Sequence, residues 1–220
     1  FTFLTGASHP AELVLRAAEL GLSGIAITDR NSLAGVVRAW SALRNLRDSL
    51  QQSLRVRSST RIDSSSRQEV SAQELPCGTM THLPKLIVGA RLVLRDCPVE
   101  WVALPTDKPA WQRLSRLLTL GKRRAEKGEC LLDLADLHAA CRGMILIALP
   151  PADLRQALAP ISAMQRRFPG HVFTGAAPRY DGTDQAWFDS CAALALRASA
   201  PLVATGDVLM HRGGRRPLAD

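Results

Sequence analysis

Apolar positions along the chain repeat with two alternating periods, one typical of helices and one typical of strands. In 8–21 apolar residues recur at helical spacing, Ser8 is a candidate N-cap, Pro10 and Glu12 fall in the first turn, and Gly21 follows the end. The run 23–29, which ends at Asp29, predicts a buried strand. A helix over 32–50 comes next, with its apolar residues on one face. The chain therefore opens with helix, strand, helix.

The same alternation resumes at residue 84 and continues to the end of the chain. The pattern predicts strands over 84–94, 100–107, 143–151, 171–177 and 201–207, and helices over 108–124, 134–141, 152–167 and 183–199. Alternating strands and amphipathic helices indicate a parallel α/β fold. A barrel is favoured over an open sheet because no Gly-rich G-x-G-x-x-G turn follows a strand. We assign the four tryptophans to the core: Trp40, Trp101, Trp111 and Trp187.

A stretch rich in Ser, Arg and Gln separates the two parts, and we expect a flexible insertion at 45–80. It is nearly without large apolar residues over 51–74, so burial offers little to offset the entropy of ordering it. A solvated loop is favoured there over a contact with nucleic acid.

Composition sets broad limits. The chain has 220 residues and is 46% hydrophobic, which favours a single domain over 1–220. Its net charge of +8 permits an acidic partner such as nucleic acid, although charge alone is weak evidence. Five scattered cysteines without a C-x-x-C pair fit a reducing, cytoplasmic setting. No apolar run approaches the roughly 20 residues that span a bilayer, so we expect no membrane partner. The start without methionine indicates a segment of a longer protein.

Charged side chains gather at the predicted carboxyl ends of strands, where α/β barrels assemble their active sites. These side chains do not suit a hydrolytic metal centre, because guanidinium groups have no lone pair to offer a cation. The candidates are Asp29, Arg30, Arg91, Asp107, Arg179, Tyr180, Asp207, Leu209 and His211.

Four separated blocks of sequence carry a resemblance to a known family. They are "FTFLTGASHPAELVLRAAELGLSGIAITDRNSLAGVVRA", "LIVGARLVL", "WQRLSRLLTLGKRRAEKGE" and "LVATGDVLMHRGGRRPLAD". Together they resemble the polymerase and histidinol phosphatase (PHP) domain of bacterial C-family DNA polymerases, the polymerase III alpha-like subunits, and closest its error-prone branch. The resemblance implies a distorted (β/α)7 TIM-like barrel whose strand ends, in active members, hold up to three metal ions and hydrolyse phosphoesters. The first strand would be truncated here, since the family's H-x-H motif would lie before Phe1.

Few of the family's ligands are present. Its T-D-H corresponds to "TDR", which keeps Asp29 and has Arg30 in place of the histidine, and its G-x-E corresponds to "GAR", with Arg91 in place of the glutamate. Its E-x-H-like strand end corresponds to Ala177 and Arg179. Its closing D-x-H keeps Asp207 but has a leucine for the histidine.

The resemblance therefore implies a vestigial metal site, at Asp29, Arg30, Arg91, Arg179, Asp207, Leu209 and His211. We expect no metal, cofactor or catalytic residue in this chain, with Asp29, Asp207 and His211 as weak metal candidates; the parent polymerase would need magnesium. We hypothesise that Arg30, Arg91 or Arg179 supplies the positive charge that metals once provided to two buried carboxylates. The alternative is that these arginines point into solvent.

A basic run after the helix over 108–124 is a further candidate surface. The resemblance implies that it could contact DNA or the polymerase core, whereas a solvated loop is the plain alternative. Its residues are Lys122, Arg123, Arg124 and Lys127.

Three functions follow from these observations. The leading hypothesis is a non-catalytic PHP domain of an error-prone DNA polymerase, acting in replication and translesion repair as a structural and interaction module. Its partners would be the rest of the polymerase chain, DNA through the parent enzyme, a sliding clamp and accessory damage-tolerance proteins. The alternatives are a metal-dependent phosphoesterase or 3'-5' exonuclease with a reduced site, and a stand-alone basic nucleic-acid-binding protein.

Overall fold

The computed structural model describes residues 6–59 and 83–218, which form a six-stranded sheet covered by helices. The strands are β1 (Gly24–Arg30), β2 (Lys85–Leu92), β3 (Glu100–Pro105), β4 (Met144–Leu149), β5 (Val172–Ala176) and β6 (Leu202–Ala204). The helices are α1 (Pro10–Glu19), α2 (Ala34–Ser59), α3 (Lys108–Arg123), α4 (Leu134–Ala140), α5 (Leu158–Arg167) and α6 (Asp184–Ala198), with 3-10 turns at Leu154–Gln156 and Gly213–Leu218.

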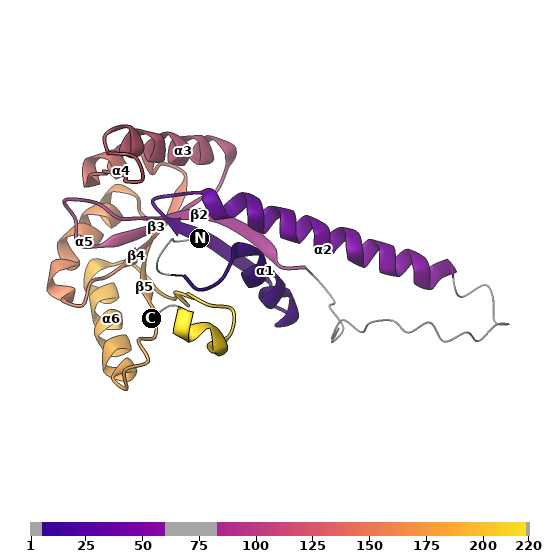
Figure 1. Ribbon diagram of the computed structural model, residues 1–220. Helices are drawn as coiled ribbons and strands as arrows, with labels where there is room; N and C mark the ends of the chain where they lie inside the picture. Colours follow the sequence, from indigo (N-terminus) through magenta and orange to yellow (C-terminus); the bar gives the residue numbers. More distant parts are fainter. Residues whose placement is uncertain (1–5, 60–82, 219–220) are drawn as a thin grey trace.

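The sheet runs in chain order from β1 to β6 and curls into a half-barrel (Figure 1). Within the described ranges, β1 and β6 are its edges and do not pair with each other. The α/β class and the barrel-like curvature predicted from the sequence are confirmed. The truncated first strand was expected at residues that lie outside the described part of the chain.

Strand direction corrects one expectation, because the sheet is not wholly parallel. β3 is antiparallel to both β2 and β4, while the other three pairs are parallel. The connection from β2 to β3 is residues 93–99. A parallel crossover needs about a dozen residues or more, so this short link forces β3 to run the opposite way.

Each strand sends alternate side chains to the helices and to the inner face of the half-barrel. In β3, Trp101 and Ala103 belong to the core beneath the helices, whereas Val102 and Leu104 line a cavity on the inner face. Trp101 is fully buried, which confirms its assignment to the core. Trp40 was assigned wrongly, since it is 53% exposed on α2.

Helix α2 is longer than expected and extends beyond the body of the domain (Figure 1). Residues 45–59 of the expected insertion are helical, so the prediction of a flexible segment is wrong there; residues 60–80 lie outside the described ranges. Leu46, Leu50 and Leu54 recur every four residues, a helical spacing that the polar composition obscured. In the described residues no helix is both long and apolar enough to cross a membrane.

The contact between β2 and β3 gives a prediction about packing. A Cβ atom added at Gly89 would lie 2.5 Å from Leu104 Cδ2 and 2.7 Å from the carbonyl oxygen of Ala103. Because the second neighbour is backbone, Gly89→Ala should cost about 1–3 kcal/mol of unfolding free energy, as overpacking commonly does. Thermal unfolding checks this against Gly213→Ala, where an added Cβ meets nothing within 4 Å. Equal melting temperatures for the two variants would contradict the close approach of the strands.

Candidate functional site at the carboxyl ends of the strands

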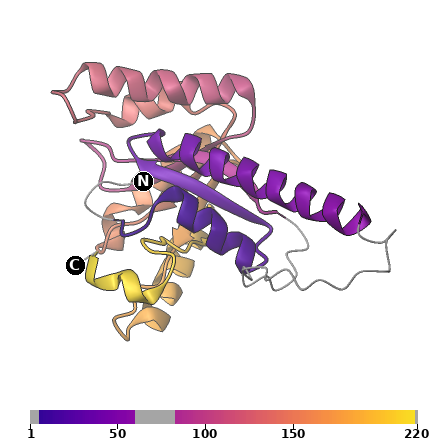
Figure 2. The same cartoon turned by 45° about the vertical axis from the view of Figure 1, so that its right-hand side comes forward.

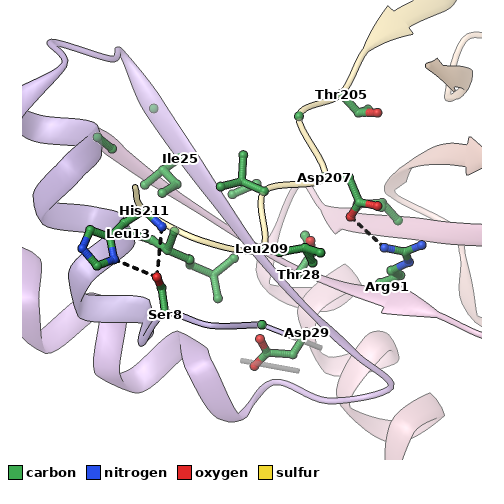
Figure 3. A pocket seen from close by; sticks show the side chains of 18 of the residues that line it. Ser8, Leu13, Ile25, Thr28, Asp29, Arg91, Thr205, Asp207, Leu209 and His211 are labelled. Carbon is green, nitrogen blue, oxygen red and sulfur yellow. Dashed lines mark hydrogen bonds and ion pairs between the residues drawn. The ribbon is translucent and has the colours of Figure 1, made fainter. Parts of the chain in front are cut away.

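The inner face of the half-barrel forms a cavity of about 920 Å³ (Figure 3). Its walls come from the inward positions of the strands, from α1 and from the segment after β6. Most of the wall is apolar, and the strand residues that make it include Ala26, Thr28, Val102, Leu104, Ile147 and Leu149. Polar chemistry is confined to its edges.

Two arginines stand side by side where β1 and β2 end. Arg30 and Arg91 are register partners on these parallel strands, so both point into the same side of the sheet. Arg91 donates from Nε to Glu100 Oε2 and from Nη1 to Asp207 Oδ1, the latter at 2.8 Å (Figure 3). Its guanidinium thereby joins β2, the first residue of β3 and the segment after β6.

Asp29 also lines the cavity (Figure 3), but its carboxylate bonds the start of α2. It follows Ile27 by two residues and, like it, is buried toward the helices, with 2% of its surface exposed. Its Oδ2 accepts a hydrogen bond of 2.6 Å from the backbone N–H of Gly35, in the first turn of α2. The amino end of a helix stabilises a carboxylate through its exposed N–H groups and its dipole. A side chain at 35 would collide with this carboxylate, because an added Cβ would lie 2.7 Å from Oδ2.

Of the two carboxylates in the hypothesis, only Asp207 is paired with one of the three arginines in the described residues. Asp207 pairs with Arg91, but its side chain is 47% exposed and so is not buried as expected. The other expected carboxylate, Asp29, is stabilised by a helix end instead. Arg30 is exposed, and none of the hydrogen bonds or ion pairs among the described residues involves its guanidinium.

Arg179 is not part of this site. Its guanidinium stacks on the ring of Trp187, with Cζ 3.4 Å from the ring centroid, and its backbone N–H donates to Asp184 Oδ1 at 2.6 Å. Trp187 Nε1 donates in turn to the carbonyl oxygen of Ala177. The loop after β5 is thus tied to the start of α6, and Arg179 does not line the cavity.

His211 belongs to a second polar cluster, which ties the end of the chain to the start of α1. Its Nδ1 lies 2.7 Å from Ser8 Oγ, and its backbone N–H donates to the same oxygen at 2.9 Å (Figure 3). Glu12 Oε1 accepts from Arg215 at 2.8 Å. Ser8, expected to cap α1, bonds His211, while His9 is the N-cap and forms a capping box with Glu12. The arrangement holds two chain segments together.

Leu209 lies at the position where the resemblance has a ligand histidine. Its side chain lines the cavity and is 43% exposed, and its carbonyl oxygen accepts a 2.9 Å hydrogen bond from Ala7 N–H. An alkyl side chain offers no donor to a metal, so this position contributes packing alone.

The weak metal candidates do not form a cluster of ligands in the part of the chain that the structure describes. Within residues 6–59 and 83–218, no group of three or more His, Cys, Asp or Glu side chains is placed to hold an ion. Burial raises the pKa of Cys141 and of Cys191 to about 11, so these two thiols are poor nucleophiles at neutral pH.

The basic run at the end of α3 is exposed and in part engaged within the molecule. Arg124 donates to Asp136 of α4, with Nη1 2.5 Å from Oδ2. The other three side chains, of Lys122, Arg123 and Lys127, are exposed. The structure thus gives Arg124 a role in joining two helices.

Two features of the site escaped the sequence analysis. Glu100, which completes the Arg91 contact, was an isolated carboxylate at a strand start, with no pattern to single it out. The Glu12–Arg215 pair joins residues some two hundred positions apart. Only the charge of each residue was visible in the sequence.

Known proteins resemble this chain in both sequence and fold. The chain is 66% identical over 221 residues to an error-prone DNA polymerase of Ruegeria pomeroyi, and 39% identical over 223 residues to one of Rhodopseudomonas palustris. Both matches cover all of this chain but only 20% and 17% of the relatives, so the chain spans about a fifth of their length. No family model matches.

Two solved structures share the fold at 14% sequence identity. One is designated a metal-dependent phosphoesterase, from Bifidobacterium adolescentis, with a TM-score of 0.58 over 97% of this chain and 86% of that one. The other is an amidohydrolase from Chromobacterium violaceum, solved with sulfate and no metal, with a TM-score of 0.56 over 98% of this chain and 87% of that one.

The curled sheet gives the chain a TIM-like fold of the kind seen in these two structures. The sequence matches, which cover all of this chain, fit the PHP domain of an error-prone DNA polymerase. The resemblance noted in the sequence is confirmed.

The cluster around α1 gives a prediction about pH. The backbone N–H of His9, opposed by desolvation and then aided by Arg215 and His211, holds the pKa of Glu12 below its ordinary 4.5. A lowered carboxyl pKa contributes stability above pH 4.5 that is lost as the pH falls through the folded-state value. Glu12→Gln should therefore flatten the fall of melting temperature below about pH 4.5. The exposed Glu129→Gln is the control, and a slope unchanged in Glu12→Gln would contradict the prediction.

Proposed function

We propose that this chain is a non-catalytic PHP domain of an error-prone DNA polymerase and serves as a structural module for the polymerase that carries it. One observation carries the proposal. Arg91 stands where the resemblance has a ligand glutamate, and its guanidinium bridges Glu100 and Asp207. The positive charge at the strand ends thus belongs to a side chain of the protein itself.

The chemistry of guanidinium explains why this replacement is stable. The group keeps its charge at all physiological pH values, and its planar fork can donate to two carboxylates at once. Ion pairs contribute more to the stability of the fold when they are partly shielded from water. The Arg91 side chain is shielded in this way, since it is 29% exposed. The bridge fixes the segment after β6 without an ion.

The wider role of the parent protein is part of the same proposal. The names of the relatives support nucleotidyl transfer on DNA in the remainder of the protein. Magnesium as its metal and the cytoplasm as its location are part of the proposal. The polymerase core is then the domain's main partner. A sliding clamp and accessory damage-tolerance proteins are the partners proposed for translesion synthesis.

A metal-dependent phosphoesterase is the second candidate, favoured by the fold of the Bifidobacterium structure. The geometry weighs against it. Asp29 is turned toward α2, Asp207 is paired with Arg91, and His211 bonds Ser8, so the three weak metal candidates do not converge. A stand-alone nucleic-acid-binding protein has less support, since the two relatives named above are far longer polymerases.

Reversing the charge of Arg91 tests the proposal. Arg91→Glu would set three carboxylates together, and we expect a loss of about 2–4 kcal/mol in unfolding free energy in buffer with EDTA, in line with broken, partly buried ion pairs. Chemical unfolding of the 220-residue chain measures it. Arg116→Glu, at an exposed position on α3, is the matched control and should change stability by less than about 0.5 kcal/mol. Equal stability of the two variants would remove the structural role.

The same substitutions in the whole polymerase separate a structural from a catalytic role. Arg91→Glu should leave the initial rate of primer extension at low temperature close to wild type and should shorten the half-life of activity on heating. A folded variant that has lost its extension rate at low temperature would contradict the non-catalytic assignment.

A further inference from the structure

Helix α2 continues beyond its contact with the core. Among the side chains that the structure describes, those of α2 that pack in the small cluster over β1 end at Leu46, although the helix continues to Ser59. Figures 1 and 2 both show it projecting away from the sheet. An isolated helical stretch of about a dozen residues is marginal in water, so an arm of this kind gains stability from a bound partner.

The solvent face of α2 combines an aromatic ring with basic side chains. Trp40 is 53% exposed and Val37 is 67% exposed. The guanidinium of Arg44, one turn further on, stacks on the Trp40 ring with Cζ 5.0 Å from its centroid. Arg47 follows on the same side of the helix and is exposed. We call Val37, Trp40, Arg44 and Arg47 the α2 face.

Charge points to the kind of partner that suits this surface. The helix carries five arginines and one aspartate between Ala34 and Ser59. An acidic partner would complement the arginines of the α2 face, and the half-exposed indole offers a flat surface for a planar ring once the Arg44 guanidinium moves from it to a phosphate. Single-stranded nucleic acid supplies both features, with phosphates for the arginines and unpaired bases to stack on the tryptophan.

We propose that the α2 face binds single-stranded nucleic acid, with a base stacked on Trp40 and backbone phosphates on Arg44 and Arg47. The helix is roughly 39 Å long, which gives room for several nucleotides along it. Duplex DNA is a poorer fit, because its bases are already stacked on one another. This inference goes beyond the structural role proposed above and does not depend on the metal-free site.

The test is the binding of a fluorescent 20-residue oligothymidylate to the 220-residue chain, followed by anisotropy at several salt concentrations. Trp40→Ala should raise the Kd about 5- to 150-fold, the loss expected for one base stacked on an aromatic ring. Arg44→Ala combined with Arg47→Ala should lower the salt slope of binding by about 1.4, the value for two phosphate contacts on a single strand.

Controls make each outcome decisive. Arg116→Ala removes an exposed arginine from α3 and should lower the slope by less than half as much as the double variant. Circular dichroism confirms that the variants keep their helix content. The proposal is overturned if wild type does not bind the oligonucleotide at 50 mM salt, a concentration at which such contacts are strong. It is also overturned if duplex of equal length binds as tightly, or if the α2 variants behave like Arg116→Ala. None of these results bears on the role of Arg91.

Discussion

The half-barrel depends on how charge is balanced where its strands end. Parallel strands bring their carboxyl ends to one edge, so polar residues distant in sequence become neighbours there. In this chain Arg91 provides the balance by holding Glu100 at the start of β3 and Asp207 after β6. Without that bridge, Glu100 and Asp207 would lose the guanidinium that joins them.

The two aspartates kept from the family pattern are stabilised in different ways. Asp29 is buried on the helix side and receives an N–H from the first turn of α2, for which Gly35 leaves the necessary space. Asp207 is half exposed and pairs with a guanidinium. In each case one carboxylate oxygen is engaged within the protein, Asp29 Oδ2 by Gly35 N–H and Asp207 Oδ1 by Arg91.

The sequence predicted the alternation of elements, and it raised the hypothesis, beside a solvent-exposed alternative, that arginines pair with the two aspartates. It did not predict the direction of β3, because periodicity reports which face a residue lies on and not which way a strand runs; the seven-residue link was the available signal. The helix predicted over 32–50 ended too early, because the polar residues between the leucines at 46, 50 and 54 obscured their helical spacing. Arg179 was included in the site because it matched a family position. In the structure it lies on a loop, and its guanidinium stacks on Trp187 instead.

The metal content of the chain tests the central claim most directly. Protein produced in medium supplemented with zinc and manganese would be purified without chelator and analysed by inductively coupled plasma mass spectrometry, with its melting temperature recorded before and after EDTA. The account predicts far less than one ion per chain and an unchanged melting temperature. Close to one ion per chain, lost together with stability in Asp207→Asn, would contradict it.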